Sequence, residues 1–225
     1  TDGALSIEEM AGTATKRGRD YLAITDHSQA VTVAKGLDGR RLRKHVKRIR
    51  EVDRRLKDIW LLAGIEVDIM KNGDLDLDAG VLAELDWVVA SIHSHMSMSA
   101  KDMTKRLVKA VSSGVIHCLG HPTARLIGKR APIEFDVETV FSACREHGVC
   151  VEIDAQPDRM DLSAAYCQRA RELGVKVSIG TDAHKENELD FLALGVNMAR
   201  RGWLERTDVI NAKTVKQLKQ YLARR

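Results

Sequence analysis

An aspartate and a histidine lie two residues apart in the segment 180–184, Gly-Thr-Asp-Ala-His. The preceding residues, 175–179, form a short β-branched run that predicts a buried strand. Because residues i and i+2 of a strand face the same side, we expect Asp182 and His184 to point at one spot. A carboxylate beside an imidazole is metal-ligand chemistry, although an isolated pair more often combines a capping aspartate with a surface histidine.

Comparable side chains follow the other predicted strands. Apolar runs predict strands at 21–25, 60–67, 87–92, 115–119 and 149–153. The polar residues at or just after their carboxyl ends are His27, Glu66, His93, His121 and Glu152. In a parallel barrel the carboxyl ends of the strands meet at one face, where chemistry collects. The pattern therefore predicts a metal site of imidazole and carboxylate ligands, which suits Zn, Mn, Fe or Co.

Amphipathic helices separate these strands, and the alternation predicts an α/β fold with a parallel sheet. The predicted helices cover residues 6–18, 39–57, 101–113, 137–147, 162–173, 189–200 and 214–223. Six or seven such units without an internal linker predict one domain, residues 1–225, that forms a closed or distorted barrel. The absence of a glycine-rich phosphate loop leaves a dinucleotide-binding fold without support.

The composition is that of an ordinary globular protein. The chain has 225 residues, of which 44% are hydrophobic and 30% are charged, enough for one sizeable core. Its apolar runs are shorter than the roughly 20 residues of a membrane helix. The four cysteines form no C-x-x-C pair, which favours reduced thiols and a cytoplasmic location. The net charge of +4 permits a polyanionic partner without requiring one.

Taken together, the motifs resemble the PHP (polymerase and histidinol phosphatase) superfamily, and most of all the PHP domain at the C-terminus of bacterial and archaeal family X DNA polymerases. The matching stretches are AITDHS at 23–28, GIEVD at 64–68, SIHS at 91–94, GHPT at 120–123, EIDAQ at 152–156, DRMDL at 158–162 and TDAH at 181–184. The resemblance implies a single-domain distorted (β/α)7 TIM-like barrel that holds up to three metals. The His-x-His pair of the family's first strand belongs just before Thr1, so we expect that strand to be truncated here.

The resemblance also implies a role for each strand-end residue. Glu66 is expected to bridge two metals, and His93 and His121 to complete one of these sites. Asp26 is expected to lie outside the ligand shell and to orient His27.

A second set of implied ligands consists of Asp2, His27 and His184. Asp182 is expected to belong to a third site beside Glu66, whose other ligands are the upstream His-x-His pair. The implied cofactors are two to three divalent transition metals, Mn, Zn or Fe. We expect the site that contains Asp182 to be weak in the chain as given, because two carboxylates bind a divalent ion loosely.

Two arginines lie in loops that follow strand ends. Arg125 and Arg159 could each bind a substrate phosphate in a bidentate manner, and a surface role is an equal alternative. We expect Glu66, Asp182 and Arg159 to act in catalysis. Glu152 is expected to line the mouth of the barrel, where it either forms hydrogen bonds or contacts a metal.

The remaining histidines carry weaker expectations. His95 is predicted to be an exposed loop residue and His117 a packed core residue, whereas His45 and His147 receive no role. The helix at 39–57 has a strongly basic face that contacts either DNA phosphates or only solvent. Solvent is favoured, because barrel helices ring the outside, away from the mouth.

The function implied by the resemblance is a metal-dependent phosphoesterase that hydrolyses phosphate esters by a metal-bridged hydroxide. Family X polymerase PHP domains imply 3′→5′ exonuclease activity or 3′-end processing, with DNA 3′ ends as substrate and the polymerase domains of a parent chain as partners. One alternative is a small-molecule phosphomonoesterase of the histidinol-phosphatase type. A second is a metal-stabilised structural module without catalysis. No membrane partner is expected.

Overall fold

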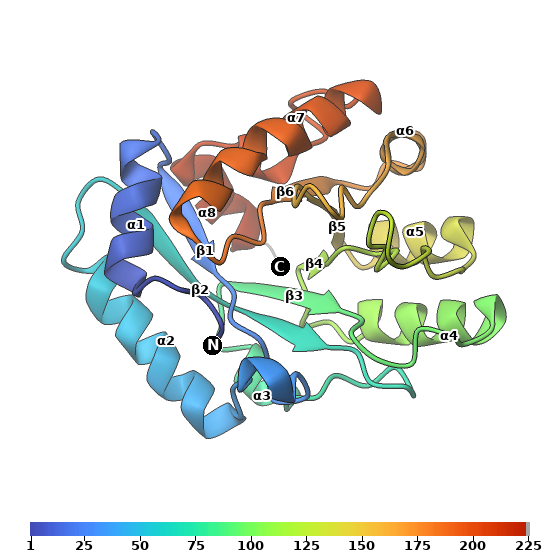
Figure 1. Ribbon diagram of the computed structural model, residues 1–225, viewed down its shortest axis with the longest axis horizontal. Helices are drawn as coiled ribbons and strands as arrows, with labels where there is room; N and C mark the ends of the chain where they lie inside the picture. Colours follow the sequence, from blue (N-terminus) through green and yellow to red (C-terminus); the bar gives the residue numbers. More distant parts are fainter. Residues whose placement is uncertain (224–225) are drawn as a thin grey trace.

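The computed structural model describes residues 1–223 as a curled sheet of parallel strands flanked by helices (Figure 1). The strands follow one another in the order β1-β2-β3-β4-β5-β6, and each neighbouring pair is parallel. The strands are β1 (Tyr21–Ile24), β2 (Trp60–Asp68), β3 (Trp87–Ser91), β4 (Cys118–Leu119), β5 (Cys150–Asp154) and β6 (Val177–Gly180). The single-domain α/β barrel class predicted from the sequence is therefore confirmed, as a six-stranded, half-barrel sheet.

Most of the longer helices begin where the sequence offers a capping side chain; α7 begins without one. The helices of eight residues or more are α1 (Ile7–Lys16), α2 (Gly39–Asp53), α4 (Ala100–Val111), α5 (Val137–Glu146), α6 (Ala164–Glu172), α7 (Leu192–Arg201) and α8 (Val215–Leu222). In six of these helices the side chain of the capping residue accepts a hydrogen bond from a backbone N–H of the first turn; the capping residues are Ser6, Asp38, Ser99, Asp136, Ser163 and Thr214. Each cap satisfies one N–H group that has no partner inside its helix.

Short helices occur where hydrophobic periodicity gives no signal. The one-turn helix α3 (Ala79–Leu82) is capped by Asp78 and is too short to show a helical repeat. The 3-10 helices are η1 (Thr32–Ala34), η2 (Glu186–Phe191) and η3 (Ile210–Ala212). Because η2 takes up the first residues of the helix predicted at 189–200, α7 begins later than expected, at Leu192.

Strand alternation divides the side chains of β2 between two environments. Leu61, Ile65 and Val67 belong to the clusters that pack against the surrounding helices. Leu62 faces the inside of the curl, where it packs with Trp87, the strand cysteines and Leu218 of α8. Thus α8 covers one end of the concave face with apolar side chains, and the carboxyl ends of the strands form the opposite end.

The sheet is open between its two edge strands. A cavity of about 820 Å³ is lined by β1 on one side and by β6 on the other. Asp2 and His27 lie at its mouth, and Leu218 lies at its base. Within residues 1–223, β1 and β6 pair with β2 and β5 and not with each other. Among the described strands, β1 pairs only with β2, so its other edge is open, whereas the outward edge of β6 is hydrogen-bonded at Val177 and Ile179 to the segment 208–211.

No helix within residues 1–223 is both long enough and apolar enough to cross a membrane.

A buried arginine fixes the two loops that follow β2 and β3. Arg106 of α4 is only 2% exposed, and its guanidinium donates hydrogen bonds to the carbonyls of Ile69, Met70 and Ser94. These carbonyls belong to the segments directly after Asp68 and His93. One side chain thus holds two strand-end loops in register with each other.

We expect Arg106→Leu to lower the free energy of unfolding by about 3 kcal/mol, because it leaves three carbonyls without their charged donor. Urea denaturation followed by circular dichroism measures the change. The matched control is Lys105→Leu on the exposed side of the same helix, which should change stability by less than about 0.5 kcal/mol. Equal losses for the two variants would contradict the role assigned to Arg106.

Candidate metal centre

Glu66 is the centre of a group of side chains at the mouth of the curled sheet. It lies near the end of β2, faces the concave side and is 7% exposed. His93 follows β3 and His121 follows β4, and both rings point at the same carboxylate oxygen. Glu66 Oε1 lies 3.4 Å from Nε2 of His93 and 3.6 Å from Nε2 of His121. Three neighbouring strands thus bring three potential ligand atoms to one point.

These separations match the spacing of ligands around a metal. Two ligands about 2.1 Å from a tetrahedral ion lie about 3.4 Å from each other. Nε2 of His121 is also buried and has no hydrogen-bond partner, a situation that a bound cation resolves. Glu66 therefore has the spacing and chemistry of a shared metal ligand toward His93 and toward His121. Two sets of three ligand atoms within 4.8 Å of one another include these residues: His27, Glu66 and His93, and His121, Glu152 and Asp154.

Outer contacts hold these imidazoles in place. Oδ1 of Asp68 lies 3.0 Å from Nδ1 of His93 and also accepts the backbone N–H of that residue. Glu152 accepts the backbone N–H of His121 at 2.8 Å, with its carboxylate 3.6 Å from Nδ1 of the ring. Contacts of this kind fix the ring orientation and leave Nε2 available as the ligand atom.

Close packing of the backbone brings His121 into this position. A Cβ atom on the preceding residue, Gly120, would lie 2.3 Å from Oγ of Ser91 and 2.6 Å from a methyl group of Val89. Only glycine permits this approach of β3 and β4. The glycine before His121 is therefore a requirement of the site geometry.

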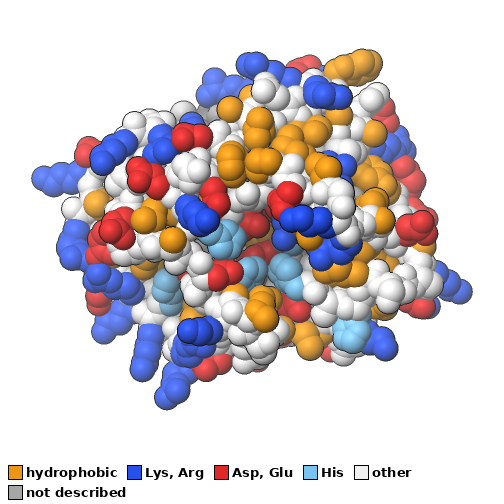
Figure 2. All heavy atoms as spheres, viewed as in Figure 1, with side chains coloured by type: hydrophobic (Ala, Val, Ile, Leu, Met, Phe, Trp, Pro, Cys, Tyr) orange, Lys and Arg blue, Asp and Glu red, His pale blue; other side chains and the backbone are white. Residues whose placement is uncertain are grey.

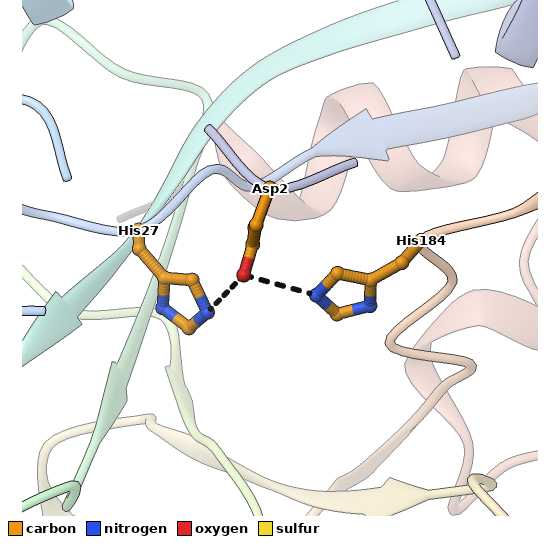
Figure 3. Close-up of side chains that lie close together, drawn as sticks. All are labelled: Asp2, His27 and His184. Carbon is orange, nitrogen blue, oxygen red and sulfur yellow. Dashed lines mark ion pairs between the residues drawn. The ribbon is translucent and has the colours of Figure 1, made fainter. Parts of the chain in front are cut away.

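A second group of ligand atoms joins the two edges of the sheet (Figure 3). Oδ2 of Asp2 lies 3.6 Å from Nε2 of His27 and 3.4 Å from Nε2 of His184. His27 follows β1, whereas His184 follows β6. Nδ1 of His184 donates a hydrogen bond to the carbonyl of Asp182 at 2.8 Å, which leaves Nε2 free to act as a ligand. This second group also has the composition and spacing of a divalent metal site.

Glu66 connects the two groups. Its Oε2 atom lies 3.1 Å from Nδ1 of His27, while Oε1 faces His93 and His121. One buried carboxylate therefore offers an oxygen toward each group. The Oε2 contact is to the ring nitrogen of His27 opposite the one that faces Asp2, so the carboxylate links the two groups through this imidazole.

Burial and charge act in opposite directions on these groups. Burial alone would lower the pKa of His93, but the carboxylates of Asp68 and Glu66 outweigh it and raise the pKa to about 10. Burial keeps the pKa of His121 well below its ordinary value, so this ring is neutral, the form that binds a metal. Burial would raise the pKa of Glu66, but the surrounding imidazoles outweigh it and hold the pKa below its usual range. The centre is thus an ionised carboxylate among imidazoles.

Asp182 and His184 lie side by side, as expected, with Oδ1 of Asp182 3.8 Å from Nδ1 of His184, but the two side chains do not aim their ligand atoms at one point. Strand β6 ends at Gly180, and Asp182 has a positive φ of 45°, so the alternation rule does not apply to the loop. The carboxylate of Asp182 lies 3.8 Å from Nε of Arg159, whereas Nε2 of His184 faces Asp2. Burial and the charge of Glu66 raise the pKa of Asp182 to about 6. Within the described part of the chain, Asp182 joins no group of three ligands.

The two arginines expected to bind phosphate have different surroundings. Arg159 lies beside the site with Nε 3.1 Å from Oδ2 of Asp154, and its buried Nη1 atom has no hydrogen-bond partner. Arg125 donates hydrogen bonds to the carbonyls of Arg159 and Met160 instead of facing the mouth. The expectation for Arg125 is therefore revised: its guanidinium holds the loop that carries Arg159.

Asp26, expected to orient His27, contacts other groups. Its Oδ2 atom lies 2.6 Å from Nε2 of His45, and Oδ1 contacts the amino group of Thr1. Successive side chains of an extended segment point in opposite directions, so Asp26 and His27 diverge. The sequence assigned no role to His45, which lies on α2 and links that helix to the mouth through Asp26.

The other histidines lie apart from the two ligand groups. His95 is exposed in the loop after β3, and His147 lies at the end of α5. His117 accepts the backbone N–H of Val88 and packs its ring 5.4 Å from that of Trp87, as expected of a packed core residue. Within residues 1–223, none of the three joins a group of metal-ligand atoms.

Comparison with known proteins identifies the family. The PHP domain family matches residues 1–156, which contain the Glu66 group and both Asp2 and His27. The chain belongs to the PHP domain family.

A long bacterial protein contains a region similar to this PHP domain. The chain is 41% identical over 224 residues to the DNA polymerase/3′-5′ exonuclease PolX of Bacillus subtilis. The match covers 100% of this chain and 39% of PolX. The PHP domain therefore spans well under half the length of this relative.

Shorter relatives and a solved structure extend the comparison. The PHP domain is 27% identical over 227 residues to a probable phosphatase of Thermoanaerobacter sp., a match that covers 96% of this chain and 87% of that protein. The crystal structure of histidinol phosphate phosphatase from Lactococcus lactis, complexed with zinc, L-histidinol and phosphate, superimposes with a TM-score of 0.61. At 11% identity, over 91% of this chain and 90% of that one, the likeness shows a shared fold.

Two acidic residues of the PHP domain received no role from the sequence. Asp68 follows Glu66 by two residues, and Asp154 follows Glu152 by two residues. Each pair lies on one strand, so alternation places both members on the concave face. Burial and the charge of Asp182 raise the pKa of Asp154 to about 8. The repeated Glu-x-Asp pattern was the signal that could have found both residues.

We expect Asp68→Ala to weaken metal binding at the Glu66 group by about 10–100-fold, because the ring of His93 loses the carboxylate that orients it. Isothermal titration calorimetry of the metal-stripped protein with Zn²⁺ measures the affinity. Asp74→Ala removes an exposed carboxylate that pairs with Lys109 and serves as the control. An unchanged affinity in Asp68→Ala would show that His93 needs no such support.

Proposed function

We propose that this PHP domain is a metal-dependent phosphoesterase that removes nucleotides from, or processes, DNA 3′ ends. The observation that carries the proposal is the convergence of Glu66 with imidazoles from β1, β3 and β4 at ligand spacing. Paired divalent metals supply Lewis-acid activation of water and neutralise charge on the phosphate. We propose Glu66, His93 and His121 as one ligand set and Asp2, His27 and His184 as another, for Mn, Zn or Fe.

We propose that Arg159 binds the phosphate group. Its Nη1 atom is buried beside the site without a protein acceptor, whereas Nε is held by Asp154. A guanidinium in this state can donate to a phosphate oxygen, and its planar fork favours bidentate contact. Asp182, on the other side of Nε, keeps the side chain aimed between the two ligand groups.

The relatives support DNA as substrate over a small phosphomonoester. Identity is 41% to a protein named as a 3′-5′ exonuclease and 27% to a probable phosphatase. We further propose that the chain works beside the polymerase domains of a parent protein, since it matches only 39% of PolX. The histidinol phosphatase activity of the structural neighbour, and a metal-stabilised module without turnover, are the competing functions.

One assay separates these functions. A 3′-labelled oligonucleotide and histidinol phosphate are incubated in parallel with the protein loaded with Mn²⁺ or with Zn²⁺. Release of labelled nucleotide that weakens steeply with salt supports the exonuclease, because DNA binding depends on released counterions. Hydrolysis of histidinol phosphate alone supports the phosphomonoesterase, and turnover of neither substrate with either metal supports the structural module.

We expect His121→Ala and His184→Ala each to lose bound metal and more than about 100-fold of the hydrolytic rate, because each removes an imidazole from a ligand set. His147→Ala and His95→Ala, which alter histidines outside these sets, should lose neither. Elemental analysis of purified protein and the oligonucleotide assay provide the two measurements. A His147 variant as inactive as His121→Ala would refute the ligand assignment.

We also propose that a strand preceding Thr1 fits between β1 and β6 and supplies the His-x-His pair. The open edge of β1 and the cavity between β1 and β6 support the proposal. Asp182 lines the same cavity, and within the described residues it belongs to no group of three ligand atoms, so a His-x-His pair would complete a set around it.

We expect an extended chain that carries this strand to bind one more metal per molecule and to hydrolyse DNA faster. The added imidazoles complete the set around Asp182, and the added strand pairs with the open edge of β1. Metal content and rate are compared with those of the 225-residue chain. The proposal fails if the shorter chain already holds three metals at full occupancy, or if the extension changes neither quantity.

A further inference from the structure

The positive charge of the chain is concentrated on one helix. Helix α2 carries seven lysines and arginines against two acidic residues, an excess larger than the net charge of +4 of the whole chain. The remainder of the sequence is therefore slightly acidic. A surface that binds a polyanion shows this kind of local excess, whereas an evenly solvated protein distributes its charges.

The cations of α2 fall into two classes. Arg43, Arg48 and Arg50 form ion pairs with carboxylates of neighbouring elements and so attach the helix to the barrel. Other exposed cations on the same helix have no such pairing. Across the described residues, no carboxylate lies within 4.0 Å of the charged groups of Arg40, Lys44 or Lys47.

These unpaired cations form a line. Arg40, Lys44 and Lys47 are spaced by four and three residues, so they lie on one face of the helix, about 4.5–6 Å apart along its axis. We call these three residues the basic stripe. Glu51, one turn further along the same face, ends it. A nucleic-acid strand places one phosphate per about 3.4 Å of axis, so three cations at this spacing can follow its backbone.

The basic stripe begins at the mouth of the barrel. The loop between β1 and α2 is tied to the site, because the N–H of Leu37 donates to the carbonyl of His27 at 2.8 Å. Arg41 donates to the carbonyls of Lys35 and Gly36 and fixes the same loop to the first turn of α2. His45, between Lys44 and Lys47 in sequence, touches Asp26 at the mouth. The first half of α2 is therefore the end that lies beside the site.

Figure 2 shows the same relation on the molecular surface. Lys and Arg side chains project along the lower left of this face, where α2 lies in Figure 1. Histidine and acidic side chains gather in the hollow beside them. Negative charge in the hollow would repel a DNA backbone unless it is offset by metals, so an adjoining positive surface is needed to hold the strand.

We propose that the basic stripe binds the phosphate backbone of the DNA strand whose 3′ end enters the site. This inference rests on the proposed function. It proposes that α2 contacts the stretch of the DNA strand that remains outside the hollow while the 3′ end is inside it. It revises the expectation that the basic face is only solvated. Because the cations face outward and lack protein partners, they contact a long substrate and not the reacting phosphate.

Binding is measured with the metal-loaded chain by fluorescence anisotropy, on a labelled single-stranded oligonucleotide with phosphorothioate linkages that resist cleavage. The stripe variant is Arg40→Gln, Lys44→Gln and Lys47→Gln combined. The control removes the same charge from exposed cations of α7 and α8, with Arg200→Gln, Arg201→Gln and Lys216→Gln combined. Circular dichroism and metal analysis check that both variants are folded and loaded.

For the stripe variant we expect the slope of log affinity against log salt to flatten by about 2, because each lost phosphate contact removes about 0.7 from the slope for a single strand. The control variant should keep the wild-type slope. Equal slopes in all three proteins overturn the inference. If the stripe variant loses binding to anionic phospholipid vesicles while its DNA binding is unchanged, the partner of the stripe is a membrane surface and not DNA, which also overturns the inference.

The failure of this inference differs from the failure of the proposed function. If the wild-type chain hydrolyses no phosphate ester with either metal, the proposed activity is wrong, while the binding slopes still decide the role of α2. If the chain cleaves the oligonucleotide and the slopes are equal, the activity stands and the DNA backbone lies elsewhere.

Discussion

The burial of one carboxylate among imidazoles governs the arrangement of the whole mouth. Glu66 is 7% exposed, and three histidine rings lie within 3.6 Å of its oxygens. A charge in this position is tolerated only when polar or charged partners surround it on several sides. Those partners come from the ends of β1, β3 and β4, and only a strongly curled sheet brings these ends around the tip of β2. The curl of the sheet and the charge of Glu66 therefore require each other.

The precision of the site depends on groups that never face it. Arg106 ties together the loops after β2 and β3, and Arg125 holds the loop that carries Arg159. Gly120 lets β3 and β4 approach closely enough for His121 to reach Glu66. Since ligand atoms must be placed within a few tenths of an ångström to bind a metal, these contacts are as much a part of the site as the ligands.

The second ligand group has a structural consequence as well. His27 and His184 follow the two edge strands of the sheet, and Asp2 lies between them. An ion bound by this trio would tie β1 to β6 across the cavity that separates them. Closure of the barrel and completion of the metal centre are thus coupled, because both depend on the same gap.

The sequence by itself determined the order of helices and strands, the α/β barrel class and the set of polar residues at strand ends, because periodicity and capping are local signals. It could not determine how loop residues point. Asp182 lies beyond the end of β6 with a positive φ, Asp26 faces His45, and Arg125 turns to backbone carbonyls. Those orientations are decided by contacts between segments far apart in sequence. Only the tertiary structure assembled Asp68 and Asp154 into the site and placed the unpaired cations of α2 beside the mouth, since proximity across a fold has no local pattern.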